Sequence, residues 1–239
     1  MIKIPELREL LEAGVHFGHK TSRWFPKMDQ YIFGSKSSIH VINLEKTQEK
    51  LKEALDFLAA ETKEGKKVVF VGTKKQAQTI VKKAAIDAGM PYIIERWLGG
   101  TLTNFKIIKR AITKLEDAKK ISEGDEFQTL KNRDKVKLIK EIVKRDKLAG
   151  GLVGLNKAPD ILILFGVKDE LNAISEARVS GVKTIGLVDT NADPNLVDFP
   201  VPANDDATKS LQLFADIFSK TVKENKSIAK KVEDKGKPQ

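Results

Sequence analysis

The sequence of 239 residues contains no cysteine and only three histidines. The absence of cysteine excludes disulfide bonds, thiolate zinc sites and cysteine nucleophiles, and three histidines leave little material for a histidine-rich metal site. No run of apolar residues is long enough to span a bilayer, and the N-terminus does not have the pattern of a signal peptide. We therefore expect a cytoplasmic protein.

Three common fingerprints of enzymes are also missing. The sequence has neither the dinucleotide motif Gly-x-Gly-x-x-Gly, nor the P-loop motif, nor the Gly-x-Ser-x-Gly elbow of hydrolases. The turn at residues 72–75 nevertheless places backbone amides and two lysines before a predicted helix, which suits a phosphate. A phosphate- or nucleotide-binding α/β enzyme that uses Gly72 to Lys75 and the Asp189 loop is therefore kept as an alternative function.

Positive charge is abundant. The chain has 43 Lys and Arg against 33 Asp and Glu, a net charge of +10. Such a surplus favours a polyanionic partner, either nucleic acid or an anionic membrane surface. The membrane surface is disfavoured because no predicted helix combines a lysine-rich face with an unpaired face of Trp, Phe or Leu.

From residue 67 onward, short apolar runs alternate with helical patterns. The runs predict strands at residues 68–71, 92–94, 161–165, 184–188 and 199–201, and the patterns predict helices at 76–88, 169–180 and 207–222. Strands that alternate with helices predict an α/β fold with a doubly wound parallel sheet. We expect the flavodoxin-like strand order 2-1-3-4-5.

The residues before this sheet read as a helix at 5–13, a β-hairpin at 31–34 and 39–42, and a long helix at 44–64 that Asn43 caps. Between them, residues 15–28 mix aromatic and cationic side chains. Aromatic rings stack on exposed bases while cations meet phosphates, so the mixture suits contact with RNA. Aromatic residues near an N-terminus also fasten loops onto a core, and both interpretations stay open.

Residues 105–148 interrupt the alternation of strands and helices. Apolar residues recur there at three- and four-residue spacings, which predicts two helices packed as an antiparallel coiled-coil hairpin. The residues concerned are Phe105, Ile108, Ile112 and Leu115 in the first helix, and Val136, Ile139 and Val143 in the second. This segment has fourteen Lys and Arg against eight Asp and Glu, so it carries more than half of the positive surplus. Its charges either solvate a helical rod or reach a polyanion or protein partner.

These patterns divide the chain into three parts. Residues 1–104 and 149–225 form the predicted α/β globular domain, and residues 105–148 form the inserted helical hairpin. The segment 226–239 is rich in lysine and poor in large apolar residues. We expect it to be a flexible basic tail.

Polar residues gather after two of the predicted strands, at 189–194 and 204–206. Turn and helix-cap chemistry explains them, because Asp and Asn accept hydrogen bonds from nearby amides. A divalent ion is the less favoured interpretation. The candidate ligands for it are His16, His19, Asp189, Asp193 and Asp205. No metal and no other cofactor is expected.

The segment from Arg96 to Phe105 joins the sheet to the hairpin. Its double glycine allows a sharp turn, and Thr103 or Asn104 is suited to cap the following helix. A capped loop with a packed Trp97 is the simple interpretation. Contact of Arg96 and its neighbours with phosphates or bases is the other.

Seven motifs stand out along the chain. They are, in order, Leu7-x-x-Leu10-Leu11-Glu12-Ala13-Gly14-Val15-His16-Phe17-Gly18-His19, Arg23-Trp24-x-Pro26-Lys27-Met28, Val71-Gly72-Thr73-Lys74-Lys75, Arg96-Trp97-Leu98-Gly99-Gly100-x-Leu102-Thr103-Asn104-Phe105, Pro159-Asp160, Asp189-Thr190-Asn191-x-Asp193-Pro194 and Asn204-Asp205-Asp206-Ala207. In these motifs and their order, the sequence resembles the S-two family of bacterial small-subunit ribosomal proteins from its first helix to its last. The hairpin, especially residues 132–147, and Lys183 depart from the family pattern.

The resemblance implies a structural constituent of the small ribosomal subunit that is not an enzyme and has a role in translation. Its implied partners are small-subunit ribosomal RNA and neighbouring ribosomal proteins, with no membrane and no small-molecule substrate. The family joins the subunit late in assembly and helps to anchor the first protein of the subunit.

Both the charge pattern and the resemblance predict RNA contacts at the N-terminal aromatic loop, at the turn after the first strand and at the root of the hairpin. The predicted RNA-binding residues are Arg23, Trp24, Lys27, Lys74, Lys75, Arg96, Asn104, Lys106, Lys109 and Arg110.

Overall fold

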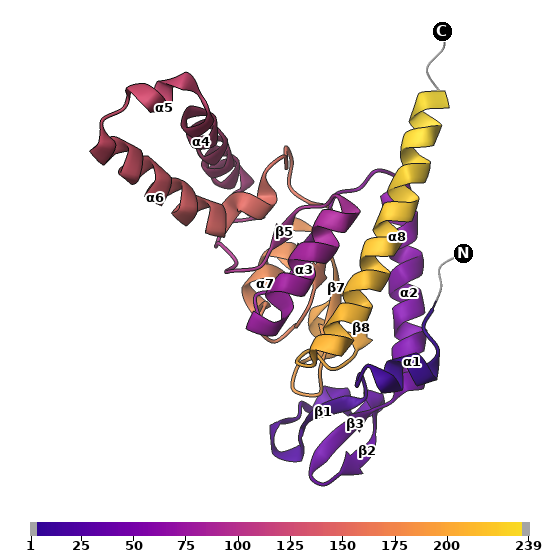
Figure 1. The fold of residues 1–239 in the computed structure, drawn as a ribbon. Helices are drawn as coiled ribbons and strands as arrows, with labels where there is room; N and C mark the ends of the chain where they lie inside the picture. The colour runs from indigo at the N-terminus through magenta and orange to yellow at the C-terminus, as the bar shows by residue number, and fades with distance from the viewer. Residues whose placement is uncertain (1–3, 236–239) are drawn as a thin grey trace.

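A five-stranded parallel sheet lies at the centre of the computed structural model, which describes residues 4–235 (Figure 1). Its strands are β4 (Val68–Val71), β5 (Tyr92–Ile93), β6 (Ile161–Leu164), β7 (Lys183–Val188) and β8 (Phe199–Pro202). Their order is β5-β4-β6-β7-β8, and every neighbouring pair is parallel. This confirms the predicted fold class and the strand order 2-1-3-4-5.

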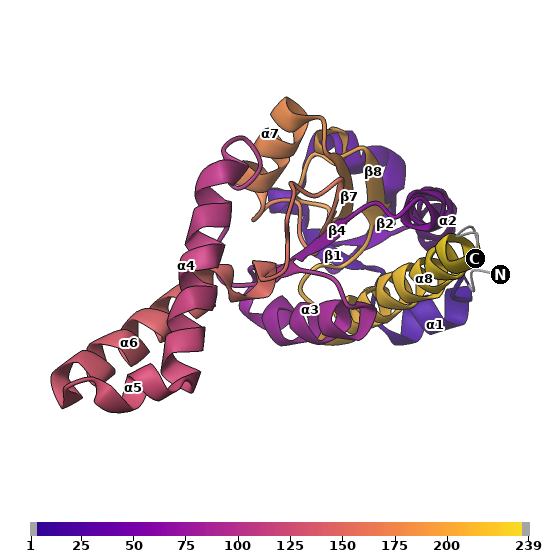
Figure 2. The same ribbon diagram turned by 90° about the horizontal axis from the view of Figure 1, so that it is seen from above.

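Helices cover both faces of the sheet, which is why its strands read as continuous apolar runs. The helices α2 (Leu44–Lys63), α3 (Lys75–Ala88) and α8 (Thr208–Lys235) pack on the face that carries Val68 and Phe70. The helix α7 (Leu171–Ser180) and the base of the helical arm pack on the face that carries Val69 and Val71. Figure 2 shows the two layers on either side of the strands.

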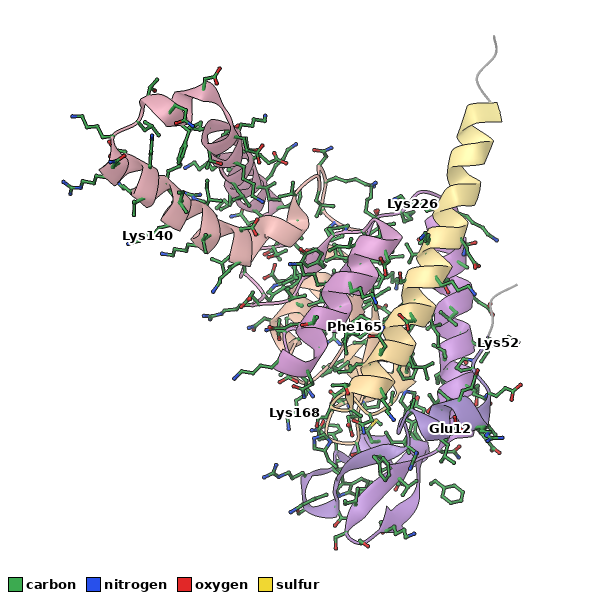
Figure 3. All side chains as sticks on the ribbon, in the orientation of Figure 1. Glu12, Lys52, Lys140, Phe165, Lys168 and Lys226 are labelled. Carbon is green, nitrogen blue, oxygen red and sulfur yellow. The ribbon has the colours of Figure 1, made fainter. Side chains whose placement is uncertain are left out.

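Phe165 follows β6 and lies in the middle of the first of these layers (Figure 3). The centroid of its ring is 6.3 Å from that of Phe70 and 6.2 Å from that of Phe218 on α8. Stacked and edge-on aromatic contacts at such distances add to the stabilisation from buried apolar area. They fasten α8 to the centre of the sheet.

The last helix is longer than the sequence predicts. It was expected to end at Val222, because few large apolar residues follow, but α8 continues to Lys235. Asn225 is buried, and Lys226 Nζ donates to the carbonyl of Gly89 at the end of α3. Residues 226–235 of the predicted tail are therefore helical, and residues 236–239 lie outside the described residues, as do residues 1–3 of the predicted globular domain.

A second, antiparallel sheet stands beside the carboxyl edge of the large one. It contains β1 (Phe17–Lys20), β2 (Ile32–Lys36) and β3 (Ile39–Ile42), in the order β1-β3-β2. The predicted hairpin is present as β2 and β3. The sequence analysis missed β1 because its residues do not alternate between apolar and polar.

Three short helices complete the N-terminal part, namely α1 (Leu7–Glu12), η1 (Thr21–Arg23) and η2 (Pro26–Tyr31), and a fourth, η4 (Pro194–Leu196), follows β7. The side chain of Asn43 accepts hydrogen bonds from Glu45 N and Lys46 N, so it caps α2 as predicted. Gly18 lies against Thr190, where a Cβ atom would be 2.6 Å from the threonine methyl carbon. The close approach fixes the small sheet to the loop after β7.

The arm leaves the sheet after β5 and returns before β6 (Figures 1 and 2). It consists of α4 (Phe105–Glu123), α5 (Asp125–Thr129), α6 (Asn132–Ala149) and the short helix η3 (Gly150–Leu152). Ile108, Ile112 and Leu115 of α4 are buried, as the spacing predicts. A coiled-coil packing of α4 on α6 is not confirmed.

The prediction of which face of α6 is buried is wrong. Val136, Ile139 and Val143 have exposed fractions of 52%, 48% and 53%. Leu138 and Ile142 are less exposed, and Ala149 is buried. Both sets of residues have helical spacing, so periodicity alone does not distinguish the face that packs from the one that is exposed.

Candidate nucleic-acid interface

The loops that follow the parallel strands meet at the carboxyl edge of the large sheet, because parallel strands end on the same side. They are the turn after β4, the loop of residues 94–104 after β5, the segment 166–170 after β6, the loop of residues 189–193 after β7 and the segment 203–206 after β8. Most of the predicted functional residues lie in or beside these loops.

Lys74 is held by this chain's own carboxylates. Its Nζ atom is 2.6 Å from Asp205 Oδ1, 2.9 Å from Asp206 Oδ1 and 3.4 Å from Asp169 Oδ2. Burial alone would lower the pKa of Lys74, but the attraction of Asp205 and Asp206 outweighs it and raises that pKa. The ammonium group therefore links the loops after β4, β6 and β8.

A backbone amide of the same turn also has a hydrogen-bond partner within the protein. Thr73 N donates to Glu170 Oε1 at 2.8 Å, and Glu170 is buried at the start of α7. Burial raises the pKa of the Glu170 carboxyl, although the hydrogen bonds from Thr73 act in the other direction. Lys75, next in the chain, is exposed and has no ion-pair partner among the residues that the structure describes.

Two of the five candidate metal ligands come together with a third group that the sequence analysis missed. His19 Nδ1 is 3.0 Å from Asp189 Oδ1, and His19 Nε2 is 3.4 Å from Asp206 Oδ2. One ligand atom from each of His19, Asp189 and Asp206 falls within 4.8 Å of the others, a geometry that a divalent cation accepts. Hydrogen bonding to Asp189 raises the pKa of His19 against the opposing effect of burial.

The other three candidates do not join this group. Asp205 pairs with Lys74, and its second oxygen, Oδ2, is buried without a hydrogen-bond partner in the described part of the chain. Burial and the nearby Asp189 raise the pKa of the Asp205 carboxyl. Asp193 pairs with Lys27, and His16 lines an apolar pocket of about 410 Å³.

Turn and cap chemistry accounts for much of the remaining polar cluster, as the sequence predicts. Asn204 Oδ1 accepts from Asp206 N and Ala207 N just before α8, and Asp193 Oδ1 accepts from Asn195 N at the start of η4.

The junction loop of residues 96–104 is packed against α7. Trp97 is only 6% exposed, and its Nε1 donates to Glu176 Oε1 at 3.0 Å. Asn104 is the N-cap residue of α4, but its side chain makes no capping hydrogen bond. The packed-tryptophan interpretation of this loop is therefore confirmed, and the sequence analysis missed Glu176 because it lies far along the chain.

Exposed cations surround this loop and the first turns of α4. Arg96, Lys106 and Arg110 are exposed and have no ion-pair partner within residues 4–235. Lys109 is exposed and donates to the carbonyl of Asn156 at 3.4 Å. Because residues three and four apart share one side of a helix, Lys106, Lys109 and Arg110 form a single basic face.

At the small sheet, Arg23 is exposed, and Lys27 Nζ lies 2.8 Å from Asp193 Oδ2. Trp24 is 37% exposed, with its ring centroid 5.3 Å from that of His40. Of the ten predicted RNA-binding residues, Lys74 and Lys27 already pair with carboxylates, although Lys27 is exposed. Within residues 4–235, no helix is long and apolar enough to cross a membrane.

Comparison with known proteins agrees with this arrangement. A family model described as "Ribosomal protein S2" matches residues 10–225. The chain is 42% identical over 223 residues to "Small ribosomal subunit protein uS2" of Coprothermobacter proteolyticus, covering 93% of this chain and 83% of that protein. Proteins of the same name from Endomicrobium trichonymphae and Dictyoglomus thermophilum are 41% and 42% identical over 228 residues, with 95% of this chain and 93% of each relative covered. The chain belongs to the ribosomal protein S2 family.

Proposed function

We propose that this chain is a structural constituent of the small ribosomal subunit that binds the RNA of that subunit through its exposed basic loops. Membership of the ribosomal protein S2 family supports a role in translation and not in catalysis. The ribosome of the cytoplasm is the corresponding location. Joining the subunit late in assembly and helping to anchor its first protein are further parts of this proposal, and they rest on the family resemblance.

The basic face at the root of the arm carries the proposal. Lys106, Lys109 and Arg110 project from one side of α4, and Arg96 precedes them in the junction loop. Cations that are not neutralised within the protein attract phosphates, and each contact with a phosphate releases a counterion. Lys75 and Arg23 add exposed charge at the carboxyl edge and at the small sheet.

Lys74 has a different part in this account, because only 15% of its side chain is exposed and its ammonium group is within 3 Å of carboxylate oxygens, so it supports the loops that carry exposed neighbours. Lys27 pairs with Asp193, but 53% of its side chain is exposed, so it remains a proposed RNA contact. Trp24 and Asn104 are exposed polar or aromatic groups and remain proposed RNA contacts, through stacking and hydrogen bonding respectively.

The alternative enzyme loses support from the same geometry. A phosphate at the turn of residues 72–75 needs free amides and a free ammonium group. Thr73 N already donates to Glu170, and Lys74 is surrounded by Asp169, Asp205 and Asp206. A phosphate placed there would compete with these four carboxylates of this chain.

Replacing the basic face tests the proposal. The variant K106A/K109A/R110A should associate more weakly with small-subunit ribosomal RNA and be incorporated less well into the subunit. The slope of log affinity against log salt should flatten by about one for each phosphate contact that is lost.

The matched control is K52A/K63A/K83A, which removes three exposed lysines of α2 and α3 on the opposite face of the sheet. It has the same change in net charge, so a nonspecific effect of charge would weaken both variants equally. The proposed interface would be contradicted if the arm variant and this control had the same affinity and the same salt slope.

A further inference from the structure

One carboxylate organises the whole junction loop. Glu176, in the middle of α7, accepts hydrogen bonds at Oε1 from Trp97 Nε1 at 3.0 Å and from Gly100 N at 2.8 Å. Its Oε2 atom accepts from Leu102 N at 2.9 Å and from Thr103 N at 3.2 Å. The hydroxyl group of Thr103 is also within 3.3 Å of Oε2.

Three of these donors, Gly100 N, Leu102 N and Thr103 N, are backbone amides just before α4, where the positive end of the helix dipole also favours a negative charge. Burial alone would raise the pKa of Glu176, but the hydrogen bonds from Trp97, Leu102, Gly100 and Thr103 outweigh it and lower that pKa. The carboxylate is therefore ionised at neutral pH. Bonds to an ionised acceptor are roughly twice as strong as neutral ones.

The loop that Glu176 holds connects the sheet to the arm. Arg96 immediately precedes Trp97, the first residue of the loop that donates to Glu176. The basic face of α4 begins at Lys106, shortly after Thr103, the last donor. Gly100 has a φ of 86° within the loop, a left-handed conformation that glycine adopts without strain and that lets the chain turn sharply before α4. The carboxylate thus fixes the position from which α4 departs.

We propose that Glu176 is a positioning residue for RNA binding, which holds the junction loop so that Arg96 and the basic face of α4 are presented together and at one angle to the sheet. This inference rests on the proposed function. Glu176 itself faces the loop and touches no RNA.

The first part of the test follows the indole of Trp97 in the full-length chain by NMR, with W24F used to assign the two tryptophan signals. In the wild type, the indole N–H signal should exchange slowly with water and should shift only at pH values below the usual range of a glutamate side chain, because the pKa of Glu176 is lowered. In E176Q, it should exchange faster and show no such titration. The same exchange rate and titration in both proteins would overturn the inference.

The second part measures affinity for purified small-subunit ribosomal RNA. E176Q should bind about tenfold more weakly, since its amide group offers one acceptor in place of two and turns an N–H group toward other donors. E95Q is the matched control, because Glu95 is an exposed glutamate of the same region with no hydrogen bond or ion pair among the described residues. E95Q should bind like the wild type.

Circular dichroism at the temperature of the binding assay shows whether E176Q is folded. If it is not, E176D replaces it, because aspartate keeps the charge but is one methylene shorter, and it should bind with an affinity between those of E176Q and the wild type. The positioning role would be overturned if a folded E176Q bound as tightly as E95Q. It would also be overturned if E176D bound as tightly as E95Q although its indole signal was displaced. Failure of the wild type itself to bind would instead overturn the proposed function.

Discussion

Lys74 Nζ lies 2.6 Å from Asp205 Oδ1 and joins the turn after β4 to the segment after β8. Asp205 is completely buried, and only 15% of the Lys74 side chain is exposed. An ion pair in such a place holds two loops together, and losing one partner leaves the other as an uncompensated buried charge. Lys74 therefore has a structural role inside the protein, whereas the adjacent Lys75 is exposed and is proposed to bind RNA.

The variants K74M and K75M test these two roles separately. K74M keeps the packing of the aliphatic stem but leaves Asp205 unpaired, so the free energy of unfolding should fall by about 2–4 kcal/mol. K75M removes an exposed charge and should change it by no more than about 0.5 kcal/mol. Urea unfolding at neutral pH measures both values. Equal losses in the two variants would contradict the internal role of Lys74.

Glu170 predicts an unusual dependence of stability on pH. Its folded-state pKa is raised, so its contribution to stability is fully present below the unfolded-state pKa of about 4.3 and is lost as pH rises through the folded-state value. E170Q keeps an oxygen that can accept from Thr73 N but has no charge to bury. The stability of E170Q relative to the wild type should therefore increase between pH 5 and pH 8.

Chemical unfolding of both proteins at these two pH values measures that difference. A gap that stays constant, or that moves in favour of the wild type as pH rises, would mean that burial does not govern the charge state of Glu170.

The double glycine of the junction loop gives a third prediction. Gly100 has a φ of 86°, whereas Gly99 lies outside the positive range and a Cβ atom there would meet nothing within 4 Å. G100A should cost about 1–2 kcal/mol of stability, because an L side chain is strained in that conformation. G99A should be neutral or slightly stabilising. The reverse order of melting temperatures would show that the loop has another conformation in solution.

The buried apolar face of α4 and the exposed apolar residues of α6 can be compared by alanine substitution. Leu115 of α4 is completely buried, so L115A should lower the free energy of unfolding by about 2–5 kcal/mol. Ile139 of α6 is about half exposed, and I139A should cost less than about 1 kcal/mol. Hydrogen exchange of the arm amides, together with thermal melting, would report both effects. A large loss in I139A would mean that its face is buried in the free protein.

The order of the sheet could be predicted from the sequence because strands covered on both faces are apolar throughout. Val68–Val71 and Ile161–Leu164 are such runs, and the helices between them leave few ways to connect parallel strands. Gly100 and Asn43 could also be read locally, since turns and caps depend on residues that are neighbours in the chain.

The internal roles of the charged residues could not be predicted. Glu170 is the N-cap residue of α7 and Glu176 lies within that helix, and the partners of both lie more than 70 positions earlier in the chain. A glutamate on a helix is usually solvated, and only the fold brings it to the free amides of a distant loop. For the same reason, the sequence gives no means of distinguishing Lys74 from Lys75, or the exposed face of α6 from the face that packs.

Binding of the wild-type chain to small ribosomal subunits that lack this protein tests the central claim most directly. Its occupancy after sedimentation should approach one copy per subunit at low salt and should fall steeply as salt is raised, because phosphate contacts release counterions. No sedimentation with the subunit, together with saturable binding of a nucleotide by the free protein, would contradict the account.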